Sequence, residues 1–388
     1  MRKYLAAVLV AIMIASLFTG CGSKGEEITE VETTGTAMEA DSDNPVFEEA
    51  RKADGSKVRV AFITDTGNID DHGYNQYTYE GIKTFCNLAG AAETYYKPAG
   101  DTDQDRLDAM RQAVDDGYNI VLAAGFLCGP SLKQAAQENP EVLFLASDVT
   151  PADLKLNEGE DIPANISMMC YREEQSGYLA GYAAVVEGYK ELGFLGGIDV
   201  PAVVRFGYGF VQGAEQASAD LGYDDVNIKY WYSGSFGPTD EIATKMDSWY
   251  VEGTEVVFAC GGGIYLSCLD AAEANDGLMI GVDVDQSNLS ENIITSAMKD
   301  LINSTVLALT AATNNDVKWP ADYSGKLINV GATENCVSLP MATSRFEVFT
   351  QEKYDELYKS LADGTLKVDD SIDSEVHPVT EHVTVDWQ

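Results

Sequence analysis

Basic residues are scarce in this chain of 388 residues, because 25 lysines and arginines stand against 63 aspartates and glutamates, a formal net charge of -38. Binding to the phosphates of a nucleic acid needs a basic footprint, so this balance argues against a nucleic-acid partner. It also argues against electrostatic docking on anionic lipid headgroups. The hydrophobic fraction of 45% is ordinary for a globular protein and too high for a disordered chain.

Patterns that bind metal ions are also missing. The chain has only three histidines, and two of them lie in the irregular, acidic segment 377–382, where we expect them to be solvated. Its seven cysteines form no CxxC pair, which argues against zinc. An acidic run from Asp101 imitates a calcium loop, but Arg106 replaces its glycine and Gln112 replaces its final glutamate. We therefore expect no metal and no cofactor.

Catalytic and phosphate-binding motifs are absent as well. The sequence holds no GxSxG, HExxH or GxxxxGK[ST] pattern. Its glycine triplet at 261–263 has the wrong spacing for a GxGxxG dinucleotide loop. We therefore predict that the chain is not an enzyme. A carboxylate-rich cleft that hydrolyses a glycosidic bond is the alternative from that class.

The N-terminus carries the one long hydrophobic run. Basic residues at positions 2 and 3 precede an apolar stretch at 4–18, which is too short to span about 30 Å of hydrocarbon comfortably. Small residues then precede Cys21. This pattern is typical of a bacterial lipoprotein signal over residues 1–20, with Cys21 lipidated as the first residue of the mature chain. The alternative is a cleaved secretory signal in which Cys21 has no role.

Residues 21–56 are predicted to form a flexible, acidic tether, because they are rich in Glu, Thr, Gly and Ser and show no apolar periodicity. No later segment approaches a transmembrane length, so the lipid would be the only membrane attachment. The protein would then lie on the outer face of the bacterial cell membrane or face the periplasm. Export permits disulfides, and spacing cannot assign partners. We favour buried free thiols for the six remaining cysteines, which are Cys86, Cys128, Cys170, Cys260, Cys268 and Cys336.

From Val58 onward, short apolar runs alternate with amphipathic stretches. Runs that are apolar throughout suit strands covered on both faces, as in parallel sheets. Strand–helix alternation is the signature of a doubly wound α/β fold. The apolar runs lie at 58–64, 120–124, 142–146, 192–196, 228–232, 256–259 and 278–282, and helical spacing occurs at 105–115, 173–186, 207–221 and 240–250.

These units are too many for one sheet of typical width, so we predict two Rossmann-like lobes joined by hinge crossovers, with a ligand cleft between them. The first lobe would span 57–168 with a return segment at about 298–335. The second would span 169–297 with a C-terminal segment at about 336–388. Parallel sheets bind ligands at the carboxyl ends of their strands. Candidate site residues should therefore follow the apolar runs directly.

Polar residues follow two runs of the first predicted lobe. Asp65 comes after the first run, and Tyr74 and Asn75 follow at the start of a helical segment. Asp and Asn exchange hydrogen bonds with hydroxyl groups, and a tyrosine ring stacks on a flat ligand. We assign Asp70-Asp71 mainly to helix capping. Asp148 follows another run with no strong helical pattern after it, so we favour ligand binding over capping there.

The second predicted lobe supplies four more candidates, and the start of the return segment supplies a fifth, Lys299. Phe206 would project toward the cleft, with core packing as the alternative. Flanking glycines place Phe236 in a loop, and around Gly262 bare main chain can approach a ligand closely. Asp283 ends another apolar run, and Lys299 follows the run at 293–295. An acidic and a basic side chain thus lie at neighbouring strand ends.

Together these pieces resemble the basic membrane protein family of substrate-binding lipoproteins, which includes bacterial purine nucleoside receptors. The resemblance covers about residues 58–330 and implies a type I periplasmic-binding-protein fold that serves an ABC importer. The matching segments are Asp71-His72-Gly73-Tyr74-Asn75-Gln76, Tyr171-Arg172-Glu173-Glu174, Tyr178-Leu179-Ala180-Gly181, Gly196-Gly197, Arg205-Phe206, Gly209-Phe210, Gly234-Ser235-Phe236, Gly261-Gly262-Gly263, Gly281-Val282-Asp283-Val284-Asp285-Gln286 and Ser296-Ala297-Met298-Lys299.

Carried over by position, the resemblance implies how a purine base is held. Tyr74 and an opposing aromatic ring, Phe206 or Phe236, would sandwich the base, while Asp148 would bond to its edge. Two positions depart from the family pattern. Tyr74 stands where the family usually has phenylalanine, and Gly263 replaces part of a Gly-Gly-Thr-Gly loop.

The resemblance also implies that Asp283 and Lys299 hold the ribose hydroxyls and that Asp65 and Asn75 complete the polar shell. Our hypothesis is a lipid-anchored solute-binding protein that delivers a guanosine-, inosine- or adenosine-type nucleoside to an ABC permease. A phosphorylated ligand is disfavoured, because one lysine among several carboxylates cannot neutralise a phosphate. A sugar is the main alternative ligand. A surface sensor lipoprotein and a nucleoside-cleaving enzyme are the alternatives from other classes.

Overall fold

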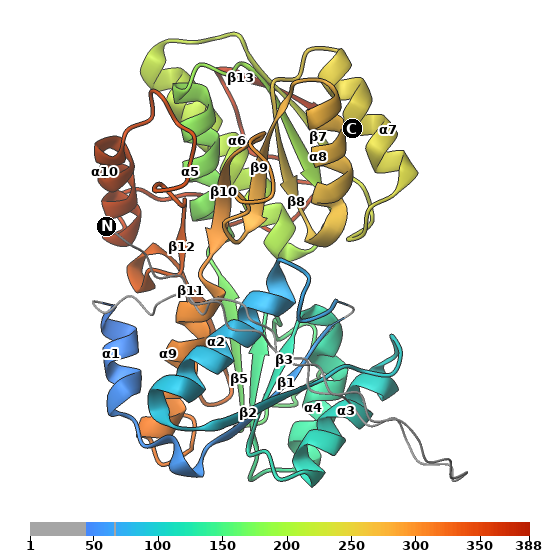
Figure 1. Cartoon of the computed structure of the whole chain (residues 1–388), viewed down its shortest axis with the longest axis vertical. Helices are drawn as coiled ribbons and strands as arrows, with labels where there is room; N and C mark the ends of the chain where they lie inside the picture. Colours follow the sequence, from blue (N-terminus) through green and yellow to red (C-terminus); the bar gives the residue numbers. More distant parts are fainter. Residues whose placement is uncertain (1–43, 66) are drawn as a thin grey trace, which may run out of the picture. The chain divides into compact units, whose positions relative to one another are not determined.

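The computed structural model describes residues 44–65 and 67–388, and all of these belong to one compact unit. Cys21, the predicted signal at 1–20 and the greater part of the predicted tether lie outside the described residues. The described chain folds into two parallel sheets with helices packed on their faces (Figure 1). The predicted doubly wound α/β architecture is therefore confirmed.

Six strands form the first sheet in the order β11-β5-β4-β3-β1-β2, and each neighbouring pair is parallel. Alternate residues of β1 pack on opposite faces: Val60 and Phe62 join the cluster that contains α2, whereas Ala61 and Ile63 join α3 and α4. Burial on both faces explains why these strands are apolar throughout. The elements are β1 (Arg59–Ile63), α2 (Tyr74–Ala89), β2 (Ala92–Tyr96), α3 (Asp103–Asp115), β3 (Ile120–Ala124), α4 (Gly129–Glu138), β4 (Leu143–Ser147), β5 (Ile166–Tyr171), α9 (Leu301–Asn314) and β11 (Lys326–Val330).

Seven strands form the second sheet in the order β12-β10-β9-β8-β6-β7-β13, and only β12 runs antiparallel to its neighbour. Helices α5 and α6 pack on one face, and α7 and α8 on the other. The elements are α5 (Glu173–Val186), β6 (Glu191–Gly196), α6 (Pro201–Leu221), β7 (Val226–Tyr232), α7 (Asp240–Val251), β8 (Val256–Cys260), α8 (Tyr265–Ala274), β9 (Leu278–Asp283), β10 (Ile293–Lys299), β12 (Val337–Ser338), α10 (Gln351–Ala362) and β13 (Val383–Trp387). We call the two sheets with their helices the first and second lobes.

The chain leaves the first sheet after β5, returns after β10 and leaves again after β11. The boundary predicted between residues 168 and 169 falls inside β5, because β5 pairs with β11 as far as Tyr171. The return segment predicted from about residue 298 starts inside β10, which pairs with β12 through Lys299. Helix α9 then packs against α2, and Figure 1 shows it, in orange, beside the blue N-terminal helices.

The last part of the predicted tether is folded, and the prediction was wrong for helix α1, Pro45–Lys52. The Asn44 side chain accepts a hydrogen bond at 2.9 Å from an N–H of the first helical turn, and a proline at the first position suits a helix start. Phe47 and Ala50, one turn apart, are buried, and α1 packs against α2 and α9. A helix of eight residues carries too little periodicity to be recognised in a polar stretch.

Helices α5 and α6 approach each other unusually closely because glycines line their interface. A methyl group on Gly181 of α5 would overlap a main-chain oxygen of α6, and one on Gly213 of α6 would overlap a main-chain oxygen of α5. Gly177 and Gly209 are in the same situation one turn away. This spacing of small residues lets two helices pack backbone to backbone. It fixes the start of α5 beside the first turns of α6.

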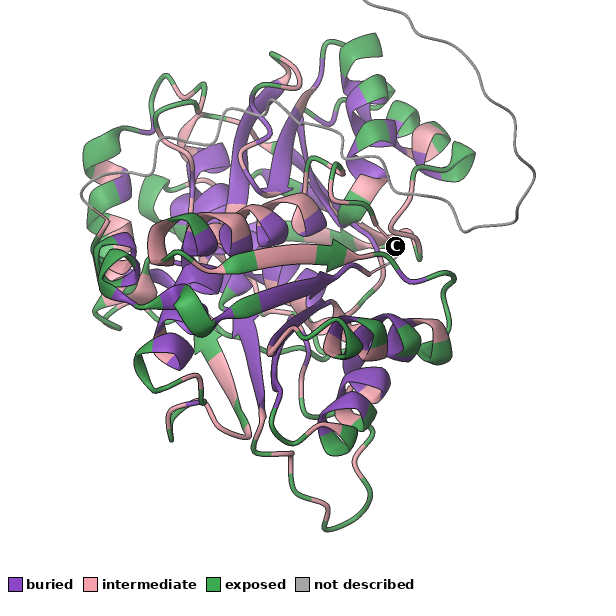
Figure 2. Ribbon diagram, turned by 60° about the horizontal axis from the view of Figure 1, so that its bottom comes forward, coloured by how far each residue is buried: buried purple, intermediate pink, exposed green. Residues whose placement is uncertain are grey.

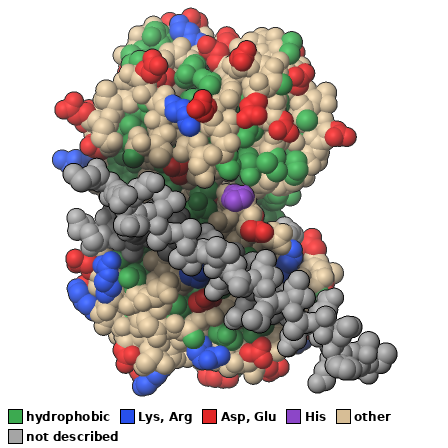
Figure 3. Space-filling view, viewed as in Figure 1, with side chains coloured by type: hydrophobic (Ala, Val, Ile, Leu, Met, Phe, Trp, Pro, Cys, Tyr) green, Lys and Arg blue, Asp and Glu red, His purple; other side chains and the backbone are tan. Residues whose placement is uncertain are grey.

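Burial follows this arrangement of sheets and helices, because the inner strands of both sheets are buried, whereas the edge strands β2, β11 and β13 and the outer helix faces are partly exposed (Figure 2). Acidic side chains are scattered over both lobes on the face seen in Figure 3, and basic ones occur singly or in small groups. The six cysteines at 86, 128, 170, 260, 268 and 336 are free and buried, which confirms the state that we favoured. Among the described residues, no helix is long and apolar enough to cross a membrane.

Candidate ligand-binding site

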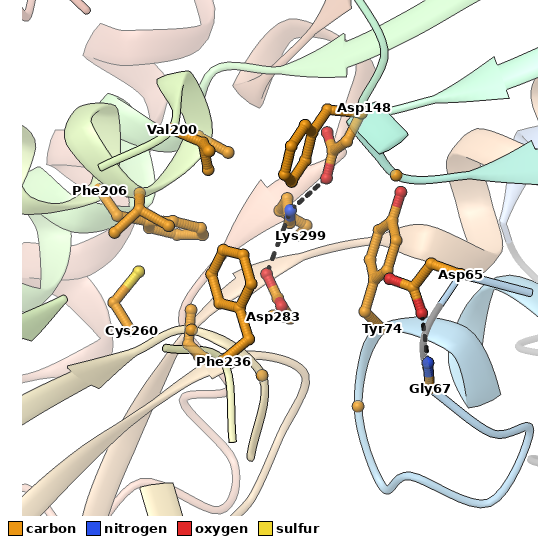
Figure 4. A pocket seen from close by; sticks show the side chains of 18 of the residues that line it. Asp65, Gly67, Tyr74, Asp148, Val200, Phe206, Phe236, Cys260, Asp283 and Lys299 are labelled. Carbon is orange, nitrogen blue, oxygen red and sulfur yellow. Dashed lines mark hydrogen bonds and ion pairs between the residues drawn. The ribbon is translucent and has the colours of Figure 1, made fainter. Parts of the chain in front are cut away.

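A cavity of about 420 Å³ is lined by loops and helix starts of both lobes (Figure 4). Cavities that bind small molecules typically measure about 300–1,000 Å³. The lining residues follow the carboxyl ends of strands in both sheets, where ligands of parallel sheets bind. The fold brings all the predicted ligand residues to this one cavity: Asp65, Tyr74, Asn75, Asp148, Phe206, Phe236, Gly262, Asp283 and Lys299. Their contact with a ligand stays a prediction.

The loop after β1 is held together by its own side chains. Asp65 Oδ1 accepts hydrogen bonds from the Gly67 N–H at 2.7 Å and from Asn75 Nδ2 at 2.8 Å. Asn75 Oδ1 accepts the Asp65 N–H at 3.2 Å. Asp71 accepts the first N–H groups of α2, which confirms its predicted capping role. Burial raises the pKa of Asp65. The polar groups of Asp65 and Asn75 are therefore largely engaged in hydrogen bonds with each other.

Tyr74 begins α2 and contributes a ring to the cavity wall. Its hydroxyl donates a hydrogen bond to Ser147 Oγ at 3.0 Å, which ties the helix start to the end of β4. Burial raises the tyrosine pKa well above its ordinary value, so the side chain stays neutral. The Lys299 ammonium lies 5.1 Å from the ring centre, within the range of a cation–π contact. The ring is therefore fixed in place at the cavity wall.

Asp148 and Asp283 occupy equivalent places in the two lobes. Asp148 follows β4 and Asp283 ends β9, and both have left-handed backbone angles, with φ of 52° and 66°. Aspartate visits this region more readily than most residues, but each instance costs about 1–3 kcal/mol. The sharp turn at each strand end directs both carboxylates toward Lys299 (Figure 4). Strain of this kind is typical of binding sites.

Lys299, at the end of β10, lies at the centre of an acidic cluster and is 4% exposed. Its ammonium is 2.6 Å from Asp148 Oδ2 and 3.2 Å from Asp283 Oδ1. It is also 3.9 Å from Glu173 Oε1. Burial opposes the charged form, but the three carboxylates outweigh it and hold the Lys299 pKa well above its ordinary value. The first lobe contributes Asp148, so this cluster joins the two lobes.

Three buried carboxylate oxygens around Lys299 accept no hydrogen bond from the described residues: Asp148 Oδ1, Asp283 Oδ1 and Glu173 Oε1. The Lys299 ammonium lies close to Asp283 Oδ1, but its direction does not suit a hydrogen bond. Buried polar atoms almost always have partners, so orphaned ones require an explanation. Asp148 and Asp283 line the cavity. Hydroxyl or N–H donors on a ligand would satisfy their oxygens.

Two aromatic rings of the second lobe face the cavity. Phe206, in the first turns of α6, is 1% exposed and packs edge-on against Phe258 at a centroid distance of 5.9 Å. Phe236 lies in the loop after β7, and a methyl group on Gly197 would come within 2.6 Å of its ring. Gly262 has φ of 54°, and a methyl group there would lie 2.7 Å from the Phe236 main-chain oxygen. Gly262 thus makes room for the Phe236 loop.

Residues 57–376 match the family model Bmp, described as ABC transporter substrate-binding protein PnrA-like. The chain belongs to this family. Basic membrane protein A1 of Borrelia garinii subsp. bavariensis is 32% identical over 286 residues, which cover 72% of this chain and 78% of that protein. A Lactococcus lactis subsp. cremoris protein named ABC transporter nucleoside-binding protein BmpA is 24% identical over 370 residues, 89% of this chain and 93% of that protein.

Solved structures agree on the fold. An ABC transporter solute-binding protein from Aeropyrum pernix K1 superposes with a TM-score of 0.65 at 19% identity and covers 82% of this chain and 95% of that one. The predicted family resemblance and the type I periplasmic-binding-protein fold are both confirmed. The chain is accordingly an ABC transporter substrate-binding protein of the Bmp family.

Several cavity residues of this Bmp-family chain were not among the predicted ones, and two of them, Phe126 and Arg205, offer an aromatic ring and a cation. Phe126 follows the end of β3 by one intervening residue and lines the first-lobe side. Its position just after the apolar run 120–124 is the sequence signal that marks it as a candidate. Arg205, next to Phe206, also lines the cavity. Its sequence context is that of an ordinary helical arginine, because its partner Glu173 lies on another helix.

A fourth acidic residue, next to Glu173 in the sequence, is expected to make stability depend on pH. Glu174 is 1% exposed, and burial, followed by repulsion from Glu173, raises its pKa from 4.5 to about 7. The folded state therefore holds this proton more tightly than the unfolded chain does, and the free energy of unfolding falls as pH rises through that interval. We expect Glu174→Gln to remove this fall, worth at most about 3 kcal/mol.

Urea unfolding at about pH 5 and about pH 8 measures this difference in the wild type and in the variant. At the higher pH, the free energy of unfolding of the variant should rise relative to that of the wild type. Glu352→Gln, at an exposed position of α10, is the control and should leave the pH dependence as it is. An unchanged pH dependence in Glu174→Gln would show that Glu174 titrates normally.

Proposed function

We propose that this substrate-binding protein encloses a purine nucleoside between its lobes and presents it to the permease of an ABC importer. The support comes from three sources: family membership, a relative named as nucleoside-binding, and the chemistry of the cavity. We further propose that Cys21 is lipidated and that the lipid holds the protein on the outer face of the cell membrane. The N-terminal sequence pattern supports that anchor.

The orphaned carboxylate oxygens beside Lys299 are the observation that carries the ligand proposal. Asp148 Oδ1 and Asp283 Oδ1 are buried acceptors that receive no well-directed hydrogen bond from the described residues, although the Lys299 ammonium lies 3.2 Å from Asp283 Oδ1. Both residues line the cavity. A ligand with neighbouring hydroxyl groups supplies donors to such oxygens, and the Lys299 ammonium donates to a hydroxyl oxygen in return. Ribose carries such neighbouring hydroxyls. The base of a nucleoside carries further N–H donors.

The charge of the cavity favours an uncharged ligand. Five aspartates line it, at positions 65, 71, 148, 153 and 283, against two cations, Lys299 and Arg205. The Lys299 ammonium is already paired with two of these carboxylates, and Arg205 is paired with Glu173. A phosphate brought into this wall would lie among like charges, which costs several kcal/mol. The free nucleoside therefore fits better than its nucleotide.

The aromatic residues of the cavity offer stacking surfaces for the base. We propose that Tyr74 stacks on one face of the base and that Phe236 or Phe206 covers the other. Offset or edge-on contacts of this kind add about 0.5–1.5 kcal/mol beyond the area that they bury. Asp65 and Asn75 would shape the loop that carries Tyr74, since their hydrogen bonds already join them.

Asp283→Ala tests the ribose contact. We expect the variant to bind inosine about 1.5–3 kcal/mol more weakly, because a charged acceptor of hydroxyl hydrogen bonds is lost. Isothermal titration calorimetry with inosine and guanosine measures the change. Asp285→Ala is a matched control: its carboxylate accepts hydrogen bonds from Thr343 and Ser287 outside the cavity, so its affinity should stay that of the wild type.

Unchanged affinity of Asp283→Ala for both nucleosides would refute the assigned role. Titration with ribose alone separates the sugar alternative, because a sugar-binding site needs no base. Chromatography of inosine after long incubation with the protein separates the enzyme alternative, since a nucleoside-cleaving enzyme would release free base and ribose.

A further inference from the structure

Arg205 is a second cation in the cavity wall, and its hydrogen-bonding capacity is largely unused. Its side chain is 13% exposed, and the residue lines both this cavity and a second, small one beside Arg172 and Glu174. Within the described part of the chain, its one hydrogen bond runs from Nε to Glu173 Oε2 at 2.6 Å. A guanidinium carries five N–H donors in a rigid plane. Four of them therefore have no acceptor in the described protein.

The buried carboxylate of Glu173 fixes the position of this guanidinium. Glu173 is fully buried, begins α5 and does not line the cavity. The glycine interface holds α5 against α6, so Glu173 and Arg205 face each other across the two helix starts. A buried carboxylate that accepts the Nε hydrogen bond leaves the outer edge of the guanidinium as a preformed fork of donors.

The fork belongs to the same cluster as the Asp148 carboxylate. Ionic contacts run from Asp148 to Lys299 at 2.6 Å, from Lys299 to Glu173 at 3.9 Å, and from Glu173 to Arg205 at 2.6 Å. Three carboxylates surround the Lys299 ammonium, whereas the Arg205 guanidinium forms an ion pair with one carboxylate, that of Glu173. The wall thus offers a ligand an acceptor, Asp148 Oδ1, and a donor fork, Arg205.

Purine bases differ along the edge that such a wall would contact. Hypoxanthine and guanine present two acceptors, N7 and O6, followed by the N1–H donor. Adenine presents N7 as an acceptor, then the N6 amino group as a donor, then N1 as an acceptor. A donor fork next to a carboxylate matches the first order. It opposes the second, because donor would face donor and acceptor would face acceptor.

We propose that Arg205 donates hydrogen bonds to N7 and O6 of a 6-oxopurine while Asp148 accepts from N1–H, so that the protein selects inosine and guanosine over adenosine. This inference rests on the proposed purine nucleoside ligand and assigns its class of base. Arg205 would be the residue that determines specificity, and Glu173 would be a positioning residue.

Changes in the ligand test the proposal without any risk to folding. Calorimetry on the wild-type protein compares inosine, adenosine and 7-deazainosine, which lacks the N7 acceptor. We expect inosine to bind about tenfold to hundredfold more tightly than adenosine, the discrimination typical of one bidentate contact. The 7-deaza compound should also bind more weakly than inosine. Equal affinity for inosine and adenosine would overturn the proposal.

Changes in the protein then identify the residue responsible. Arg205→Met keeps the apolar stem of the side chain but removes the fork. It should lower inosine affinity about tenfold to hundredfold and leave adenosine affinity within about threefold of the wild type. Arg205→Lys keeps the charge without the planar fork and should recover only part of the loss. Arg172→Met is the control: Arg172 lies two residues before Glu174, is 45% exposed and does not line the main cavity.

Each outcome decides between the claims. If Arg205→Met loses the same factor of affinity for inosine and for adenosine, the assigned specificity is overturned. The loss of a merely structural arginine would weaken the binding of both nucleosides alike. If Arg205→Met does not fold, the inosine-to-adenosine ratio of Arg205→Lys decides, and a ratio like that of the wild type would overturn the proposal. Failure of every purine nucleoside to bind the wild type would instead reject the proposed function itself.

Discussion

Replacing Lys299 with methionine should abolish nucleoside binding and lower the free energy of unfolding by about 3–5 kcal/mol at neutral pH. The variant leaves the carboxylates of Asp148 and Asp283 buried without a cation, and Glu173 with Arg205 as its remaining partner. Breaking a buried ion pair from one side costs far more than the pair contributes as a whole, since an uncompensated charge remains. Urea unfolding and calorimetry with inosine measure the two effects.

The loss of stability in Lys299→Met should shrink in acid, because protonation neutralises the carboxylates that have lost their partner. Lys318→Met serves as the control, since the Lys318 side chain is 73% exposed and exposed ion pairs contribute about 0–1 kcal/mol. A Lys299→Met protein that binds inosine normally and unfolds like the wild type would contradict the central role of this cluster.

The double variant Gly181→Ala with Gly213→Ala should lower the free energy of unfolding by about 4 kcal/mol, since each overpacked site costs about 1–3 kcal/mol. Each new methyl group meets a main-chain oxygen of the opposing helix, which cannot rotate away as a side chain does. The helices must separate, and the start of α6 then moves away from α5. Nucleoside affinity should fall too, because Arg205 and Phe206 lie in those first turns.

Thermal or urea unfolding of the double variant measures the loss of stability, and calorimetry on the folded protein measures the loss of nucleoside affinity. Gly237→Ala is the control, because the nearest atom to its added methyl group would be 4.0 Å away, an ordinary contact. It should change stability by about 0.5 kcal/mol or less. A double variant as stable as the wild type would show that α5 and α6 adjust without cost.

The ends of buried strands were predictable from the sequence, because a parallel strand covered on both faces is apolar throughout and its end is marked by the first polar residue. Asp65, Asp148 and Asp283 were found in this way, and the structure places all three in one cavity. Lys299 was recognised by the same rule. The architecture followed from the same pattern, since repeated strand–helix units leave few alternatives to a doubly wound fold.

Contacts between distant segments were not predictable. Arg205 is distinguished by its pairing with Glu173, 32 residues earlier, and that pairing depends on how α5 packs on α6. Asp65 and Asn75 bond to each other only because the loop between them folds back. The short helix α1 was missed because its burial depends on α9, more than two hundred residues later.

Calorimetry of the wild-type protein with inosine and with inosine 5′-monophosphate tests the central claim most directly. The claim is that an uncharged nucleoside satisfies the carboxylates around Lys299. Inosine should bind, and its monophosphate should bind at least about hundredfold more weakly, because like charges brought together cost several kcal/mol. Equal or tighter binding of the monophosphate, or no binding of inosine, would contradict it.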